Sequence, residues 1–219
     1  MRARIHDGVI GAGRSRKDVI MQAIRIIHEE HRTLAAVLHG MLYLTRMIRE
    51  QGAKPNFELF GAMLYYIDAF PERFHHPKEN NYLFQLLRIR HPEAAPLLDQ
   101  LENEHRVGAQ KIRALEQALV RYHHGGATEF AQFAAALENY ATFHWDHMRA
   151  EEDKVLPLAQ KHLTEGDWEA IDAAFLGHTV PMLGVEAGEE YSALFHRIVN
   201  LAPPPIGVGP AAKKATSSS

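Results

Sequence analysis

Four stretches of the chain, each about 30 residues long, carry apolar side chains at alternating steps of three and four residues. Because an α-helix completes a turn in about 3.6 residues, this spacing collects the apolar side chains on one stripe. A β-strand would need strict alternation, and no stretch follows that pattern. The sequence therefore predicts long amphipathic helices that pack along their stripes. The first stripe consists of Ile20, Ile24, Ile27, His31, Leu34, Leu38, Met41, Thr45 and Ile48.

Glycine and proline mark the ends of these helices. In the first connection, Gly52 is typical of the residue just past a helix end, and Pro55 cannot continue a helix. The segments RHPEAAP and HHGGAT separate the later helices in the same way. Four long helices with short connections predict an all-α fold, an antiparallel up-down four-helix bundle. The expected helices cover residues 18–50, 56–90, 93–122 and 128–162.

Segments on both sides of the bundle differ from it in composition. The N-terminal segment is rich in glycine and arginine, and the C-terminal end has no periodic apolar face. Two shorter helical patterns, at about 167–176 and 181–200, follow the bundle and should cover it. The predicted regions are a flexible N-terminal arm at 1–17, the bundle at 18–163, a C-terminal helical extension packed on the bundle at 164–200, and a disordered tail at 201–219.

Composition excludes several classes of protein. The 219 residues are enough for one substantial core, and the net charge of −3 gives no basic surface typical of nucleic-acid binding. Cysteine is absent, so disulfides and thiolate metal sites are excluded. The N-terminus lacks the apolar run of a signal peptide, and no run of 18 apolar residues occurs. We therefore expect a cytoplasmic protein that binds neither nucleic acid nor membranes.

Polar residues interrupt the apolar stripes at related positions. The first and third helices each contribute one histidine, and the second and fourth each contribute an H-x-x-x-E pair. The single histidine and the histidine of the following pair are 44 residues apart in the first half and 42 in the second. Residues four apart share a helix face. Two similar helical hairpins should therefore bring six polar side chains into one core: His31, His75, Glu79, His105, His147 and Glu151.

The free energy of burial argues against a purely structural role for this cluster. An unpaired buried polar group costs about 1–3 kcal/mol, and an ionised carboxylate costs more. Six such groups would consume most of a typical stability of roughly 5–15 kcal/mol. Metal coordination satisfies their lone pairs. Six ligands without sulfur are too many for one tetrahedral zinc ion and suit two metals bridged by the glutamates. Iron is our first expectation and manganese the second, with zinc as a further alternative.

The chain also resembles the hemerythrin-like (HHE cation-binding) domain proteins. The resemblance covers about residues 20 to 162, and four segments carry it: HEEHR around His31, FHHPKENNYLF on the second helix, ENEHR around His105, and HMRAEEDKVLP on the fourth helix. It implies a bundle that encloses a non-haem, carboxylate-bridged di-iron centre, with the six residues named above as ligands.

The sequence departs from the oxygen-carrying hemerythrins of marine worms at two places. Those proteins have a second histidine on the third helix, where this chain has Ala109, and they end with His and then Asp at i+5, where this chain has His and Glu at i+4. The set of four histidines and two glutamates is more similar to the iron-sensing and peroxide-handling members of the superfamily.

Other polar residues lie near the expected ligands. Four are candidates for additional ligands or for side chains that hydrogen-bond to a ligand: His28, His144, Asp68 and Tyr140. His76 follows His75 directly, so on a regular α-helix it should point about 100° away and lie outside the site. Pro77 stands between His75 and Glu79 and removes a helical hydrogen bond, so we expect a local bulge that re-aims both side chains.

These observations predict a protein that binds or reductively handles a small oxidant, namely dioxygen, hydrogen peroxide or nitric oxide. A peroxidase-like oxidoreductase activity would fit such a site, with an electron donor that the sequence does not identify. Two alternatives stay open. The protein could be an iron or oxygen sensor that folds with its metal and signals to a protein partner, or it could store metal without turnover. A homodimer also stays open.

Overall fold

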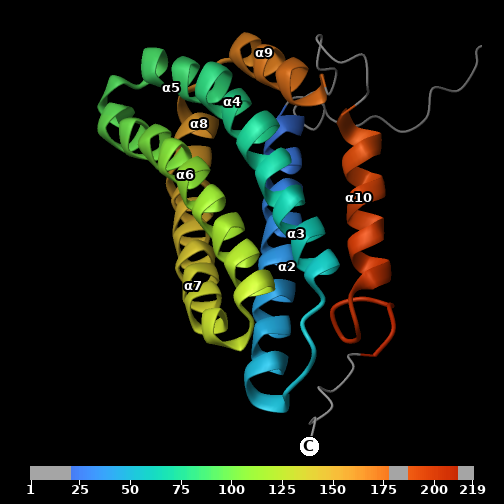
Figure 1. The fold of residues 1–219 in the computed structure, drawn as a ribbon. Helices are drawn as coiled ribbons and strands as arrows, with labels where there is room; N and C mark the ends of the chain where they lie inside the picture. Colours follow the sequence, from blue (N-terminus) through green and yellow to red (C-terminus); the bar gives the residue numbers. More distant parts are fainter. Residues whose placement is uncertain (1–20, 178–186, 212–219) are drawn as a thin grey trace, which may run out of the picture.

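The computed structural model describes residues 21–177 and 187–211, and within them the prediction of an all-α fold is confirmed (Figure 1). The first expected helix is α2 (Gln22–Gln51) and the third is α6 (Ala95–Gly125), which follows a 3₁₀ turn at Pro92–Ala94. The second and fourth expected helices are each divided into segments. These are α3 (Phe57–Ala69), α4 (His76–Lys78) and α5 (Gln85–Arg90) in the second, and α7 (Ala127–Ala150) and α8 (Leu156–His162) in the fourth.

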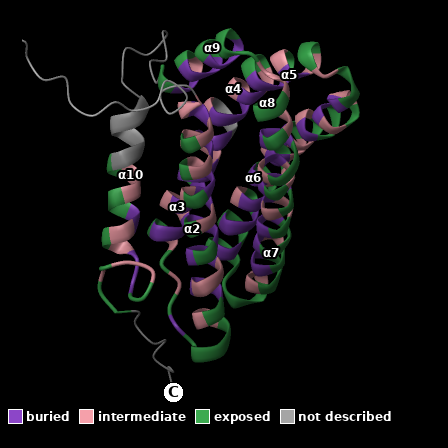
Figure 2. Ribbon diagram, turned by 180° about the vertical axis from the view of Figure 1, so that it is seen from behind, coloured by how far each residue is buried: buried purple, intermediate pink, exposed green. Residues whose placement is uncertain are grey.

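The long helices form a bundle in which each packs against two neighbours. Helix α2 contacts α3 and α7, and α6 contacts the same two helices from the other side. The connections follow the predicted chemistry. Gly52 adopts a left-handed conformation (φ 63°) just past α2, and the Asn56 side chain accepts a hydrogen bond from the Leu59 amide at the start of α3. Figure 2 shows the buried residues turned toward the inside of the bundle.

A layer of polar residues divides the apolar core into two clusters. One cluster surrounds the connection between α2 and α3 and includes Leu38, Phe60 and Phe133. The other lies near the opposite end of the bundle and includes Ile27 and Leu101. On α2 and α6, the predicted site histidines fall between residues of the two clusters. The polar residues that interrupt the apolar stripes therefore lie together in one polar layer across the bundle.

Two further helices cover the bundle. Helix α9 (Glu165–Leu176) packs on α2 and α4, and α10 (Ala187–Leu201) packs on α3. Both carboxylate oxygens of Asp172 on α9 accept hydrogen bonds at the start of α2, from the Met21 amide at 2.8 Å and the Ala23 amide at 2.7 Å. Helix α9 thus caps a helix about 150 residues away in the chain.

The predicted disordered tail is wrong for residues 201–211. These residues turn back onto α10, where the amides of Val208 and Gly209 donate hydrogen bonds to the carbonyls of Val199 and Ala202. Ala202 is buried and packs with the apolar core. The predicted N-terminal arm, the expected helix start at residue 18, residues 181–186 and the tail beyond 211 lie outside the described residues. None of the described helices is long and apolar enough to cross a membrane.

Candidate metal centre

Three π-helical segments distort the helices that carry the H-x-x-x-E pairs. They cover Pro71–His75, Glu79–Phe84 and Glu151–Val155. Each contains a proline or lies within two residues of one, and a proline ring clashes with the carbonyl four residues earlier in a regular helix. A π turn, with its i→i+5 hydrogen bonds, relieves this clash. The irregularity predicted at Pro77 is thus present, but it lies on both sides of the short helix α4 rather than between His75 and Glu79.

The fourth helix contains a π segment that the sequence reasoning missed. It begins at Glu151, and its i→i+5 hydrogen bond runs from the Leu156 amide to the Glu151 carbonyl. The available signal was Pro157, which lacks the amide hydrogen that a regular helix would use. All three π segments begin or end at a predicted site residue, so the backbone distortion lies where these side chains enter the core.

The six predicted residues meet in the polar layer as two histidine pairs. The Nε2 atoms of His31 and His75 are 3.1 Å apart, and those of His105 and His147 are 3.0 Å apart. All six side chains are buried, with at most 5% of each residue exposed. One member of each pair comes from a single-histidine helix and the other from an H-x-x-x-E helix, as the repeat of two hairpins predicted.

The two glutamates lie between the histidine pairs. Glu79 directs Oε1 to His75 Nε2 at 3.3 Å and Oε2 to His105 Nε2 at 3.5 Å. Glu151 directs Oε2 to His31 Nε2 at 3.3 Å and Oε1 to His147 Nε2 at 3.1 Å. Each carboxylate therefore offers one oxygen to each histidine pair. Neither oxygen of Glu79 has a hydrogen bond of good geometry within the described part of the chain, although this side chain is fully buried.

This arrangement fits metal ions by the chemistry of its donors. A buried carboxylate without hydrogen bonds is costly in a metal-free protein, and a cation removes that cost. Imidazole and carboxylate are both good ligands for divalent transition metals. One set of ligand atoms, from His31, His75, Glu79 and Glu151, lies within 4.8 Å of one another, close enough to hold an ion.

A ring of hydrogen bonds holds the four histidines from outside. The Nδ1 atom of each histidine lies 2.5–2.9 Å from a side-chain oxygen of the preceding helix of the bundle, with the fourth helix preceding the first. Such bonds select the tautomer whose Nε2 is free to bind a metal and orient the ring. The acceptors are Glu152 for His31, Glu30 for His75, Asn80 for His105 and Glu104 for His147.

The sequence reasoning missed these four acceptors, although a signal was present. Each is the immediate neighbour of a predicted site residue: Glu30 and Glu104 precede a histidine, and Asn80 and Glu152 follow a glutamate. Three acceptors are carboxylates and one is a neutral amide. The His105 side of the centre therefore has a weaker negative field than the other three positions.

The charges of the centre are coupled in the absence of metal. Burial lowers the pKa of His147, but Glu151 and the hydrogen bond to Glu104 outweigh this effect and raise the pKa to about 10. The pKa values of His31 and His75 are also raised, because their carboxylate neighbours outweigh the effect of burial. Burial raises the pKa of Glu151, but His147 and the other histidines bring it well below its usual range. The buried carboxylates therefore favour the protonated forms of His31, His75 and His147 in the absence of metal.

His76 lies inside the centre, contrary to the prediction that it points away. It is buried, and its ring is parallel to that of His105 with the centroids 4.0 Å apart. Its ligand atom lies within 4.8 Å of those of His105 and His147. The prediction assumed a regular α-helix, but the π segment that ends at His75 has a wider turn, so successive residues are separated by less than about 100°.

The four additional candidates have different positions. His28 lies 3.3 Å from Glu152, the acceptor of His31, so it contacts a residue of the outer ring. His144 is buried beside the centre, with its ring 6.3 Å from that of His147, and Tyr140 packs against it at 4.4 Å. Burial, together with the nearby His147, lowers the pKa of His144 to about 3. Asp68 is half-buried on α3 and is not one of the four acceptors that hold the histidines.

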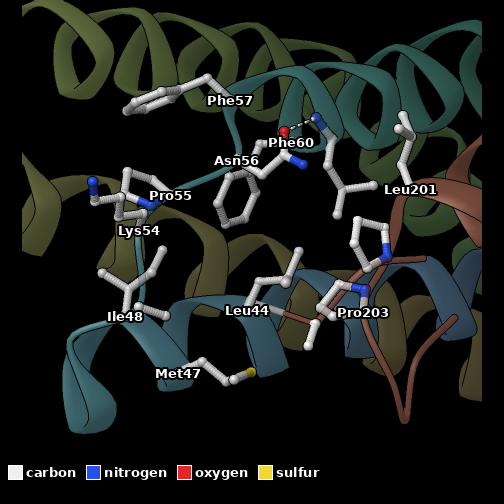
Figure 3. A pocket seen from close by; sticks show the side chains of 14 residues that line it. Leu44, Met47, Ile48, Lys54, Pro55, Asn56, Phe57, Phe60, Leu201 and Pro203 are labelled. Atoms are coloured by element: carbon white, nitrogen blue, oxygen red, sulfur yellow. Dashed lines mark hydrogen bonds between the residues drawn. The ribbon is translucent and has the colours of Figure 1, made fainter. Parts of the chain in front are cut away.

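Two pockets lie at different distances from the centre. A shallow surface depression of about 360 Å³ runs between α2 and α7 and is lined in part by His31, Trp145 and Glu152. An apolar pocket of about 350 Å³ lies near the connection between α2 and α3, with Leu44, Phe60 and Leu201 among its lining residues (Figure 3). No residue of the centre lines this second pocket. Of these two pockets, the surface depression is the one that includes a residue of the candidate metal centre, His31.

Comparison with models of protein families gives a match. The family model described as the hemerythrin HHE cation binding domain matches residues 22–159. This range includes all six converging residues and the four acceptors that hold the histidines. No match was found among curated proteins or solved structures.

Proposed function

The chain belongs to the hemerythrin HHE cation-binding family, and we propose that its centre holds two iron ions with which the protein binds or reduces a small oxidant. One ion would be held by His31 and His75, and the other by His105 and His147. Both would share Glu79 and Glu151. Family membership and the buried cluster of histidines and glutamates support cation binding.

The observation that supports two ions is the position of the glutamates. Each carboxylate offers one oxygen to each histidine pair, at 3.1–3.5 Å from a ring nitrogen. A single ion would bind one histidine pair. The other pair, and the glutamate oxygens directed to it, would then be left without a metal. Two ions use all eight donor atoms, which is the arrangement in which buried polar groups cost least.

Iron is the metal that we propose, because the donors would leave open coordination positions on it where an oxidant can bind. Two imidazoles and two carboxylate oxygens supply four donors at each position, fewer than the six that iron commonly takes. Manganese and zinc accept the same donors and are the alternatives. Bound iron would supply electrons to dioxygen, hydrogen peroxide or nitric oxide.

The residues of this chain then have distinct tasks. The carboxylates and amide of the outer ring keep the imidazoles oriented, so the donor atoms need little rearrangement on metal binding. Aromatic rings of Phe84, Phe143 and Phe175 lie beside His105, His147 and His75, with centroids 5.8–6.4 Å apart, and limit the access of water. The depression lined by His31 and Glu152 is the proposed approach for a small oxidant.

The test is metal analysis combined with optical spectroscopy. Protein produced in iron-rich medium should contain two iron ions per chain, and near-ultraviolet absorption of oxidised iron should appear when the anaerobic protein meets air. Stopped-flow mixing of the reduced protein with peroxide or nitric oxide would then identify the oxidant. A folded chain that takes up no iron under anaerobic loading would contradict the proposal.

A second candidate function, an iron or oxygen sensor, is favoured by the position of α9. This helix packs on α4 and on the π segment at Glu79–Phe84, both of which lie next to the centre. Phe175 of α9 contacts the His75 ring and lies 5.4 Å from Lys78 Nζ. Loss of metal could therefore release α9 for a protein partner. Hydrogen exchange in α9 that is unchanged by metal removal would rule out this candidate.

A further inference from the structure

We propose that His76 is a fifth histidine ligand, which binds the metal held by His105 and His147 and makes the two metal positions unequal. This inference rests on the proposed function. It adds a residue outside both H-x-x-x-E pairs and outside the set of six that the repeat of hairpins identifies. The metal at the other position would be held by His31 and His75 alone among the histidines.

The first support is position. The ligand atoms of His76, His105 and His147 form a group within 4.8 Å of one another. The corresponding group on the other side consists of His31, His75 and the two glutamates, and it contains no third histidine among the described residues. The His76 ring is 4.0 Å from that of His105 and 5.7 Å from that of His147.

The second support is backbone geometry. His75 ends one π segment, and Glu79 begins the next. The His76 amide donates to the Pro71 carbonyl, an i→i+5 bond that belongs to a widened turn. This turn brings two consecutive histidines into the same core, one beside each metal position. A regular helix would turn His76 away, so the distortion has a direct consequence for the number of donors.

The third support is charge. His76 is buried, with its ring beside those of His105 and His147. The outer acceptors on this side of the centre are the neutral Asn80 and the carboxylate of Glu104, whereas both acceptors on the other side are carboxylates. A third histidine would give this metal an additional donor without adding negative charge.

Coordination requires one change in the centre. An imidazole lone pair lies in the plane of its ring, and the rings of His76 and His105 are within 10° of parallel. Two parallel, stacked rings cannot both point at one ion. The His76 ring must therefore turn relative to His105 when metal binds.

The test counts coordinated imidazoles in the intact protein loaded with cobalt(II), a paramagnetic stand-in for iron(II). Each coordinated ring contributes one strongly shifted, solvent-exchangeable N–H signal to the proton NMR spectrum. Five such signals are expected from the wild-type chain, and four would overturn the proposal. This measurement needs no substitution and does not depend on catalytic activity.

A variant then assigns the fifth signal. His76→Gln should remove one shifted signal and weaken the binding of one of the two cobalt ions by more than about 100-fold. Loss of an outer hydrogen-bond partner weakens metal binding by at most about 100-fold. His144→Gln is the matched control, because His144 is equally buried and lies beside the centre but outside both candidate groups. It should leave both affinities unchanged. A smaller loss in His76→Gln, or an equal loss at both positions, would overturn the proposal.

The two proposals fail in distinguishable ways. A wild-type chain that binds no metal at all overturns both. A chain that binds two metals with four shifted signals, and whose His76→Gln variant keeps both affinities, leaves the proposed function standing. In that case His76 only packs against His105.

Discussion

Removal of a shared glutamate should weaken both metal positions, whereas removal of a histidine should weaken one. Glu79 contributes an oxygen to each position, and His31 contributes a nitrogen only to the position that it shares with His75. Glu79→Ala and His31→Ala therefore separate a bridged pair of ions from two independent sites. Both side chains are buried, so each variant must be compared with its own metal-free form.

The size of the effect follows from the number of donors. Structural zinc sites with four ligands bind with roughly 10–16 kcal/mol, which corresponds to about 3 kcal/mol for each ligand. His31→Ala removes one donor, so its metal-induced stabilisation should fall by about 3 kcal/mol. Glu79→Ala removes a donor from both positions, so its loss should be about 6 kcal/mol. For a chain of this size, 1 kcal/mol shifts Tm by about 2–4 °C.

The assay is differential scanning calorimetry of the metal-free and the anaerobically iron-loaded forms of each protein. The rise in Tm on loading should be smaller than in wild type by roughly 6–12 °C for His31→Ala and by roughly 12–24 °C for Glu79→Ala. His144→Ala, which is buried beside the centre but outside both candidate groups, should keep the wild-type rise. If Glu79→Ala loses no more than His31→Ala, the two ions are not bridged by Glu79 and the reasoning is wrong.

Three further predictions concern the surroundings of the centre. Glu30→Gln should weaken the binding of one metal ion about 10- to 100-fold without a change in fold, because Glu30 holds the His75 ring. Competition with a chelator would measure this loss of affinity. Asp172→Ala removes two hydrogen bonds at the start of α2 and should cost about 2 kcal/mol, or roughly 4–8 °C in Tm; an unchanged Tm would contradict the role of α9 as a cap. The Arg90 guanidinium lowers the pKa of Asp167 in the folded protein. The ionised pair therefore stabilises the protein fully above the unfolded-state pKa of about 4. This stabilisation is lost as the pH falls through the lower folded-state pKa. The difference in urea stability between metal-free wild type and Asp167→Asn should therefore shrink between pH 6 and pH 2, and a constant difference would refute the ion pair as its source.

Most of the fold could be predicted from the regular spacing of apolar residues. Residues such as Leu34, Leu38 and Met41 repeat at helical spacing, and Gly52 and Pro55 end their helix in the manner that their chemistry requires. The six converging polar residues could be identified from the sequence for the same reason, since each replaces an apolar residue on a buried stripe. The positions of these residues along the bundle follow from spacing alone.

Other features of the centre depend on departures from regular helices. The prediction for His76 failed because it used the angle of an ideal α-helix, and the π segment at Pro71–His75 changes that angle. The tail at 201–211 was misjudged for a related reason. Its backbone hydrogen bonds to α10 and the burial of Ala202 follow no periodic pattern.

The amino-acid sequence by itself determined the helical class and the identity of the six polar residues that meet in the core, because each depends on local spacing of residue types. Only the tertiary structure decided that Glu79 and Glu151 lie between the histidine pairs, that Glu30, Glu104, Asn80 and Glu152 hold the imidazoles, and that Asp172 caps α2. These contacts join residues from different helices, some more than 100 positions apart. Their partners are chosen by the rotation of each helix in the packed bundle, which local spacing does not encode.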